Sequence, residues 1–394
     1  MSTASPAPGL LFTAFEPSGD EHAAPVIAEL RRRRPDLTIY ALGGPLMAAA
    51  GAELIESSTD NAVMLQGTVT QAVSHYQRVG RLGQWLEGRR IAALVPVDSP
   101  AANWSICALL RRRQPQARIV HLVAPQLWAW APWRIRKLRR LSDHVLCLLP
   151  FEAQWFAARD MPATFVGHPV FDPQLHQPPP PLADAPAGAV KLALLPGSRM
   201  GEIDANLLTM LQVTAQLQQR HPGLAAVVSA RDVRGAEKVN AVIDRARQQK
   251  QAIGPVTVRH GQTEAVIAWA DVVLATSGTV TLHIVAQRKP MVVFYNTSKL
   301  LVQLLARWLV HTRTFTLPNL ISESLGLGRA VPEYVPHFRQ VDPLVAEMDR
   351  LISQPQSRAE QTDRLAHIAQ TFANKHYAQE SAEKILALLE AAAD

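Results

Sequence analysis

The amino-acid sequence predicts an α/β protein made of two doubly wound domains, each with a parallel sheet covered by helices on both faces. Short apolar strand patterns alternate with helical patterns through the first 175 residues, as is typical of a buried parallel sheet. The alternation stops at the four prolines of residues 178–181, because proline can continue neither a helix nor a central strand. A second alternating series begins at residue 190. Two such domains predict a ligand cleft between the carboxyl edges of their sheets.

Each expected strand is a short run rich in valine, isoleucine, leucine or alanine. In the first domain these runs span residues 10–14, 38–42, 92–97, 119–123, 144–149 and 164–166. Amphipathic helices are expected between several of them, as over residues 24–33 and 103–112. The second series spans residues 190–195, 225–229, 257–259, 272–275 and 291–295. The expected domains are residues 1–175, a proline-rich linker over 176–189, a second domain over 190–341, and helices over 342–394 that end in one long amphipathic stretch over 358–392.

Composition limits the class of protein. Hydrophobic residues make up 48% of the 394 residues and the net charge is +7, which excludes general disorder and suits an anionic partner. Cys107 and Cys147 lack metal-binding spacing, so we expect a reduced, cytoplasmic protein without a structural metal. We expect no signal peptide in the first residues and no membrane-spanning segment, because no apolar run is long enough. The apolar stretch over 300–310 contains Arg307, so it is expected to lie on a bilayer if it touches one.

A cluster of tryptophans precedes a basic helix and suggests a membrane surface. Trp128, Trp130 and Trp133 come before a pattern that turns three apolar residues inward. The outward positions are basic: Arg134, Arg136, Lys137, Arg139 and Arg140. Such a charge run is usually a solvated face, but beside exposed aromatic residues it could also rest on anionic lipid. Nucleic acid is not expected, because the sequence carries no recognisable nucleic-acid-binding motif.

Four strand-to-helix turns carry candidate ligand-binding residues. The first, at residues 16–20, contains Ser18, Gly19 and Asp20, and the second contains Asp98 after a buried strand. Each aspartate either caps a helix or points into a ligand crevice. The third turn, "PGSR", places Ser198 and Arg199 before a helix that starts near Glu202. Free N–H groups there, together with Arg199, would form an anion site for a diphosphate, although an ordinary helix cap explains the turn equally well.

The fourth turn follows the strand over residues 272–275. It contains Ser277, Gly278 and Thr279. Two small polar turns in one domain can together hold a nucleotide diphosphate. Each turn is a weak signal alone, but the pair favours nucleotide binding by the second domain.

An ordered series of motifs resembles the lipid-A-disaccharide synthases, inverting glycosyltransferases of the two-domain GT-B type. The motifs, in chain order, are "EPSGDEHAA", "LGGPLMAAAG", "VDSPAAN", "APQLWAWAPWRIRKL", "LPFE", "FVGHPVFD", "LLPGSRMGEI", "TSGTVTL", "PMVVFY", "LPNLI" and "VPE". They run from about residue 10 to residue 333. So many motifs in one order make chance agreement improbable.

The resemblance implies a specific reaction. The family joins UDP-2,3-diacylglucosamine to lipid X, an acylated monosaccharide 1-phosphate, and forms a β-1,6 disaccharide with release of UDP. It implies a cytoplasmic enzyme, peripheral at the inner membrane, without metal or cofactor. Its partners would be a UDP-sugar donor, an acylated sugar phosphate acceptor and an anionic membrane surface, with a homodimer left open.

The resemblance also implies roles for single residues. Asp98 matches the aspartate proposed as general base, and Ser18, Gly19, Asp20 and Gln126 match the acceptor side. The nucleotide side matches Ser198, Arg199, Glu202, Ser277, Gly278, Thr279, His283 and Asn319.

Three positions depart from the family pattern. His283 stands where the family has a glutamate that, in GT-B enzymes, commonly holds the ribose hydroxyls. Phe15 replaces a glycine, and Ala102 replaces a phenylalanine. The alternatives to a lipid-A-disaccharide synthase are therefore another GT-B enzyme, either a different glycosyl transfer or a UDP-sugar epimerase, and a non-catalytic relative that binds UDP-sugar or lipid.

Overall fold

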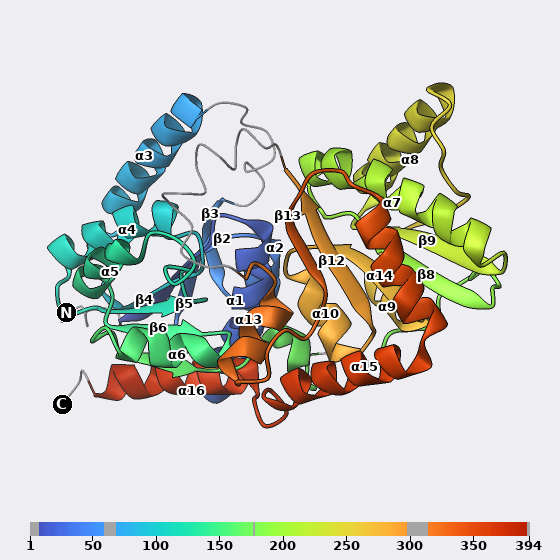
Figure 1. The fold of residues 1–394 in the computed structure, drawn as a ribbon. Coiled ribbons are helices and arrows are strands. Elements are labelled where there is room, and N and C mark those ends of the chain that lie inside the picture. Colours follow the sequence, from blue (N-terminus) through green and yellow to red (C-terminus); the bar gives the residue numbers. More distant parts are fainter. Residues whose placement is uncertain (1–7, 59–67, 176–177, 298–313, 392–394) are drawn as a thin grey trace, which may run out of the picture. The chain divides into compact units, whose positions relative to one another are not determined.

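Two parallel sheets form the framework of the protein. The computed structural model describes residues 8–58, 68–175, 178–297 and 314–391. One sheet has seven strands in the order β3-β2-β1-β4-β5-β6-β7, and the other has six in the order β10-β9-β8-β11-β12-β13 (Figure 1). The chain divides into two compact units, Met1–His176 with Asn374–Asp394 and Gln177–Ala373, and each contains one sheet. The prediction of two doubly wound α/β domains is confirmed.

The first unit alternates strands and helices as the sequence predicts. Its strands are β1 (Gly9–Thr13), β2 (Ile39–Gly43), β3 (Glu53–Ser57), β4 (Ile91–Pro96), β5 (Arg118–Leu122), β6 (His144–Cys147) and β7 (Ala163–Phe165). Its helices are α1 (Pro17–Arg33), α2 (Pro45–Ala49), α3 (Thr68–Trp85), α4 (Pro100–Arg113), α5 (Ile135–Leu141), α6 (Pro150–Ala157) and α16 (Tyr377–Glu390).

Side-chain alternation along the central strands fills a core on each face of this sheet. Leu10 and Phe12 of β1 belong to a core that includes α1 and α16, whereas Leu11 belongs to a core that includes α3 and α4. All three side chains are fully buried. Burial on both faces explains why this strand has a continuous apolar sequence, the pattern from which it was predicted.

The second unit repeats this plan. Its strands are β8 (Val190–Leu195), β9 (Leu224–Ala230), β10 (Thr257–His260), β11 (Val272–Thr276), β12 (Met291–Asn296) and β13 (Glu333–His337). Its helices are α7 (Met200–Arg220), α8 (Val233–Gln248), α9 (Thr263–Trp269), α10 (Val280–Ala286), α13 (Leu317–Ser324), α14 (Asp342–Ser353) and α15 (Pro355–Gln370).

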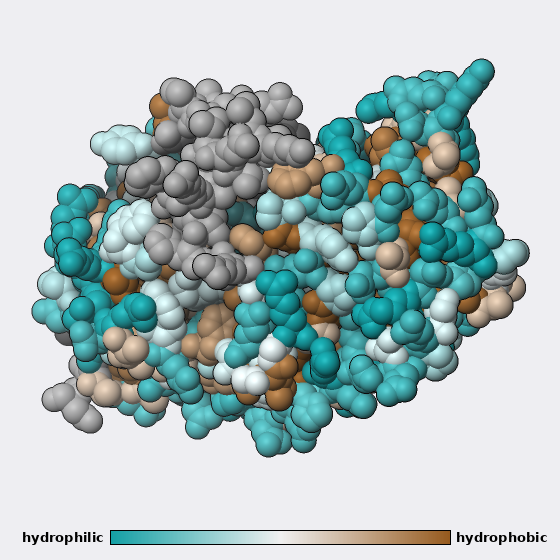
Figure 2. Space-filling model, in the orientation of Figure 1, coloured by the Kyte–Doolittle hydropathy of each residue, from teal (hydrophilic) through white to brown (hydrophobic). Residues whose placement is uncertain are grey.

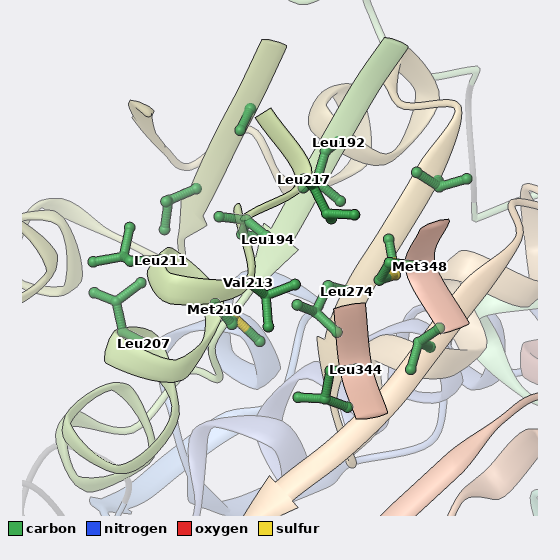
Figure 3. Close-up of a cluster of buried hydrophobic side chains, with 14 of the residues drawn as sticks. Leu192, Leu194, Leu207, Met210, Leu211, Val213, Leu217, Leu274, Leu344 and Met348 are labelled. Carbon is green, nitrogen blue, oxygen red and sulfur yellow. The ribbon is translucent and has the colours of Figure 1, made fainter. Parts of the chain in front are cut away.

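One large apolar cluster holds α7, α8 and α14 on this second sheet. Leu192 and Leu194 of β8 and Leu274 of β11 lie among side chains of α7 and α14, including Leu217 and Met348 (Figure 3). All five are fully buried. Burying an aliphatic side chain of this size contributes about 1.5–3 kcal/mol relative to leaving it in water.

Two strands were absent from the expected set, and both are edge strands. β3 pairs only with β2, and β13 pairs only with β12. The five residues of β3 are partly or fully exposed, and β13 contains Pro336. Edge strands need no continuous apolar run because one side pairs with nothing, and proline is tolerated there. The apolar-run criterion therefore misses them.

The amphipathic stretch expected over residues 358–392 is divided between two helices. The chain forms α15 and α16 there, with a break between Gln370 and Tyr377. α15 packs on α10, α13 and α14 of the second unit, whereas α16 packs on α1 and β5 of the first (Figure 1). The apolar faces of the two helices serve different cores, so the regular pattern does not correspond to one continuous helix.

Apolar surface is scattered on the face shown in Figure 2, where hydrophilic residues predominate and the outer end of α8 is hydrophilic. No helix in the part of the chain that the structure describes is long and apolar enough to cross a bilayer. The apolar stretch over 300–310 lies outside the described residues.

Strand order reverses once in each sheet. In the first unit the chain builds β1, β2 and β3 in one direction and then restarts from β4 on the other side of β1. In the second unit the same reversal occurs between β8 and β11. In parallel doubly wound sheets the ligand crevice lies at the carboxyl ends of the strands at this reversal. The predicted turns after β1, β4, β8 and β11 follow these four strands.

Tyr377 of α16 is expected to contribute measurably to the stability of the first unit. It is fully buried, and its hydroxyl donates a 2.8 Å hydrogen bond to the carbonyl oxygen of His22 in α1. Tyr377→Phe leaves that carbonyl without this donor and should lower the free energy of unfolding by about 1–2 kcal/mol in urea titrations. Tyr76→Phe is the matched control, because Tyr76 is 80% exposed. Equal stability of the two variants would contradict the prediction.

Candidate functional site

The end of β4 brings Asp98 to the strand-order reversal of the first unit. The N–H of Val97 donates to the carbonyl oxygen of Thr13 at 2.9 Å, and the N–H of Asp98 donates to that of Leu122 at 3.0 Å. Asp98 is thus tied to β5, while the residue before it is tied to the end of β1. Main-chain hydrogen bonds alone therefore hold the backbone of Asp98 at this position.

The backbone around Asp98 adopts conformations that are unfavourable for most residues. φ is +47° at Asp98, +37° at Ser99, +65° at Val123 and +55° at Ala131. Values in this left-handed region are uncommon outside glycine, and a β-branched residue such as valine is an outlier there. All four positions follow β4 or β5 in the chain. Strained conformations persist only where surrounding contacts over-determine them, and they concentrate at functional sites.

Asn103 provides such contacts. It is fully buried in the first turn of α4, and its side-chain amide donates to the carbonyl oxygens of Val97 at 3.0 Å and Asp98 at 2.8 Å. Its side-chain oxygen, Oδ1, accepts a 2.7 Å hydrogen bond from the hydroxyl of Thr13 on β1. One side chain therefore joins the ends of β1 and β4 and holds the left-handed turn at Asp98.

The environment of Asp98 favours its neutral form. Burial raises the pKa of Asp98 above the usual value for aspartate, a hydrogen bond from the Ser99 N–H opposes this, and the Glu16 carboxylate adds to the increase. Glu16 is itself held by the Ser99 hydroxyl, which donates to it at 3.2 Å. A carboxylate with a raised pKa is a stronger proton acceptor than an exposed aspartate.

A second carboxyl group, Glu152, organises the segment after β5. Glu152 is buried at the start of α6, where it accepts hydrogen bonds from the indole N–H of Trp128 and the N–H of Leu149, each at 3.0 Å. Burial raises its pKa to about 7, and the charge of Asp98 contributes to that increase. Trp128 is thereby fixed next to Phe151, with ring centroids 5.0 Å apart. Gln126, two residues earlier, is exposed.

The three predicted residues of the first turn have different surroundings. Ser18 is half-buried in the first turn of α1. Gly19 packs so closely on the end of β1 that a Cβ there would lie 3.0 Å from the Cβ of Ala14. Asp20 is buried and accepts hydrogen bonds from the N–H groups of Gly44, Leu46 and Met47 at 3.0–3.2 Å. Its carboxylate therefore stabilises the start of α2.

In the second unit the turn after β8 differs from the expected anion cradle. The carboxylate of Glu202 accepts hydrogen bonds from the N–H groups of Ser198 at 3.0 Å and Arg199 at 3.2 Å. The expectation that these N–H groups are free is wrong, because the helix carries its own acid in its first turn. Gly197, with φ of +110°, makes room for that acid, since a Cβ there would lie 2.5 Å from Glu202 Oε2. The Arg199 side chain is 76% exposed.

The turn after β11 is tied to the rest of the second unit through hydroxyl groups. Thr276 donates to the carbonyl oxygen of Leu195 at 3.2 Å, which joins the ends of β11 and β8. Ser277 donates to the carbonyl oxygen of Phe315 at 3.0 Å. Gly278 and Thr279 are exposed at the start of α10. His283, one turn further along α10, contacts the carboxylate of Glu264 through Nδ1.

Asn319 is a buried structural residue of α13. Its side-chain oxygen accepts from the N–H groups of Ala330 at 2.8 Å and Val331 at 2.9 Å, and its amide donates to the Val331 carbonyl and to Glu333. Glu333 also accepts hydrogen bonds from Phe315 and Thr316. These contacts occupy the hydrogen-bonding groups of the Asn319 side chain and organise the segment that Ser277 contacts.

Several residues with clear roles in this geometry had no predicted role. Glu152 and Glu333 end the motifs "LPFE" and "VPE", so their motifs were visible although their contacts were not. Asn103 lies in "VDSPAAN", five residues after Asp98. Glu264 lies in no quoted motif, and only the tertiary structure brings it to His283.

Comparisons with known proteins agree on the family. The family model of lipid-A-disaccharide synthetase matches residues 10–387. The lipid-A-disaccharide synthase of Anaeromyxobacter dehalogenans is 32% identical over 398 residues, which cover 96% of this chain and 97% of the relative.

Solved structures agree on the fold. The UDP-GlcNAc 2-epimerase of Neisseria meningitidis bound to UDP-GlcNAc has a TM-score of 0.57 at 11% identity, with 97% of this chain and 99% of that chain covered. CalG4, the calicheamicin glycosyltransferase, has a TM-score of 0.57 at 17% identity, with 98% and 99% covered. These likenesses show the GT-B fold alone, whereas the family match extends over nearly the whole sequence. The chain belongs to the lipid-A-disaccharide synthase family, the glycosyltransferases of lipid A biosynthesis.

Proposed function

We propose that the protein transfers 2,3-diacylglucosamine from its UDP derivative to lipid X, 2,3-diacylglucosamine 1-phosphate, with release of UDP. Asp98 carries the proposal. It is a half-buried carboxylate with a raised pKa, in a strained turn at the strand-order reversal of the first unit. A catalytic base needs this combination of a fixed position and increased basicity.

The proposed reaction is a single displacement. Asp98 removes the proton of the acceptor 6-hydroxyl while the oxygen of that hydroxyl attacks the anomeric carbon of the donor. The bond between that carbon and the UDP oxygen breaks, and UDP leaves with the electron pair. Asp98 ends as a carboxylic acid, and the configuration at the anomeric carbon is inverted.

We assign the leaving group to the second unit. UDP gains negative charge as the bond breaks, and a nearby cation stabilises that charge. The Arg199 side chain is exposed beside the turn after β8. Ser277, Gly278 and Thr279 form the neighbouring turn after β11. Because Glu202 occupies two N–H groups of the β8 turn, we give Arg199 the larger part in holding the diphosphate.

Asp98→Asn should abolish most turnover without destabilising the fold. The amide cannot accept the proton, and loss of a general base costs about 10²–10⁴-fold in rate. Folding raises the pKa of Asp98, so the folded state favours the neutral acid. The stability that the neutral acid contributes is lost as pH rises through the pKa of the folded state. At neutral pH the neutral asparagine avoids this loss, and it tolerates a positive φ well.

Two assays check this prediction. UDP release should fall in the variant, while its melting temperature at pH 7 should equal or exceed that of the wild type. Asp244→Asn is the control, because Asp244 is an exposed aspartate of α8. Near-normal UDP release by Asp98→Asn would refute the role of Asp98 as base.

We further propose that the first unit binds an anionic membrane surface at the cytoplasmic face of the inner membrane. Trp130 is 43% exposed and Trp133 is 57% exposed, directly before α5. Arg136 and Arg140 are exposed on α5, whereas Arg134 and Lys137 lie over the ring of Trp104 at 4.4 and 4.9 Å. The two exposed tryptophans and the outward arginines together suit a lipid interface.

Removing the exposed tryptophans should weaken membrane binding. The double variant Trp130→Ser and Trp133→Ser should co-sediment less than the wild type with vesicles of phosphatidylglycerol and phosphatidylcholine. Added salt should weaken the binding of the wild type to these vesicles. Leu327→Ser is the control, because it removes an exposed apolar side chain, 47% exposed, from the second unit. Equal binding by the tryptophan variant and the wild type would refute the assignment.

A further inference from the structure

Glu264 presents a carboxylate at the carboxyl edge of the second sheet. It lies in the first turn of α9, and its side chain is 37% exposed. The preceding residue, Thr263, shares a 2.9 Å hydrogen bond between its hydroxyl and that of Ser229 on β9. The start of α9 is therefore fixed to the sheet, and the position of the Glu264 backbone is fixed with it.

Two side chains, one within α10 and one directly after it, orient this carboxylate. His283 Nδ1 contacts Oε1, and Gln287 Nε2 donates to Oε2 at 2.5 Å and to the Glu264 carbonyl oxygen at 3.2 Å. An ionised carboxylate only accepts hydrogen bonds, so this contact with an ionised Glu264 requires a hydrogen on His283 Nδ1. His283 is 28% exposed. The acid is thus held from one side by α10 and can be reached from solvent.

The location of this group suggests a ligand. α10 begins directly after the turn of Ser277, Gly278 and Thr279, at the strand-order reversal of the second unit. In doubly wound nucleotide-binding sheets an acidic side chain near this point accepts hydrogen bonds from the ribose hydroxyls. Here α10 carries His283 one turn after these residues, and the neighbouring helix α9 supplies an acid that contacts it.

We propose that Glu264 binds the ribose hydroxyls of the nucleotide and that His283 and Gln287 position it. The proposal rests on the proposed function, in which the second unit holds a UDP-sugar. A carboxylate offers about four acceptor positions, so one acid can serve His283, Gln287 and a ribose hydroxyl together. Glu264 is the binding residue, and His283 is a positioning residue.

This arrangement predicts a distinctive response to mutation of His283. Glutamate at position 283 would place a second negative charge beside Glu264 and remove a hydrogen-bond donor, so His283→Glu should weaken UDP binding. The exchange variant, Glu264→His with His283→Glu, returns one acid and one imidazole to the pair and should bind UDP within about three-fold of the wild type. That recovery would show that the pair acts as a unit.

The test is calorimetry with UDP, 2′-deoxy-UDP and 3′-deoxy-UDP. The wild type should prefer UDP to at least one deoxy analogue by about ten-fold or more, as expected for loss of a hydrogen bond to a charged group. Glu264→Gln should bind UDP about ten-fold more weakly and lose this preference. Glu264→Asp retains the charge on a side chain that is one methylene shorter, so it should also lose the preference for UDP over the deoxy analogues. It serves as the second variant if Glu264→Gln does not fold.

Glu237→Gln is the matched control, because Glu237 is exposed on α8 of the same unit. It should bind all three ligands as the wild type does. If the wild type binds no UDP, the proposed function fails. If the wild type binds UDP but folded Glu264→Gln retains both affinity and ribose preference, this inference alone fails. Tighter UDP binding by His283→Glu would also overturn it, because Glu264 would then not be the ribose acceptor.

Discussion

Parallel strand direction is the constraint on which the rest of this protein depends. Because all strands of a sheet run the same way, every strand-to-helix turn emerges at one edge. The two reversals of strand order, at β1 and β4 and at β8 and β11, then bring together turns from distant parts of the sequence. Ser99 lies 83 residues from Glu16 along the chain, yet its hydroxyl donates a hydrogen bond to the Glu16 carboxylate. The same constraint places Ser277 in the turn next to that of Ser198.

Buried polar side chains turn this general layout into fixed local geometry. Asn103 holds the left-handed backbone at Asp98, and Glu152 holds Trp128. Asn319 and Glu333 do the same for the segment that Ser277 contacts. Buried amides and carboxylates are stable only when their hydrogen bonds are satisfied, so each one specifies the positions of its partners. These residues support the site without needing to touch a substrate.

Local charge decides what each turn can do. Glu202 fills part of the β8 turn with its own carboxylate and also pairs at 3.7 Å with the guanidinium of Arg199, whose side chain is exposed. Burial and the nearby Glu16 carboxylate raise the pKa of Asp98. Similar strand-to-helix connections therefore place a half-buried carboxyl group in one unit and an exposed arginine in the other. The difference lies in a few side chains around each turn and in how deeply they are buried.

The amino-acid sequence alone predicted the doubly wound class, eleven of the thirteen described strands, and the turns that carry Asp98, Arg199 and Ser277. These features are local, because an apolar run or a small polar turn is legible within a few residues. The edge strands β3 and β13 were not predicted: β3 is partly or fully exposed, and β13 contains a proline.

Only the tertiary structure decided what each polar side chain contacts. It gave Asp20 to the start of α2 and Asn319 to a buried network, and it separated α15 from α16. It also placed Glu264 against His283, nineteen residues away along the chain. The physical reason is that hydrogen bonds between side chains depend on how helices pack on a sheet. That packing is set by many dispersed apolar contacts, and no short stretch of sequence encodes it.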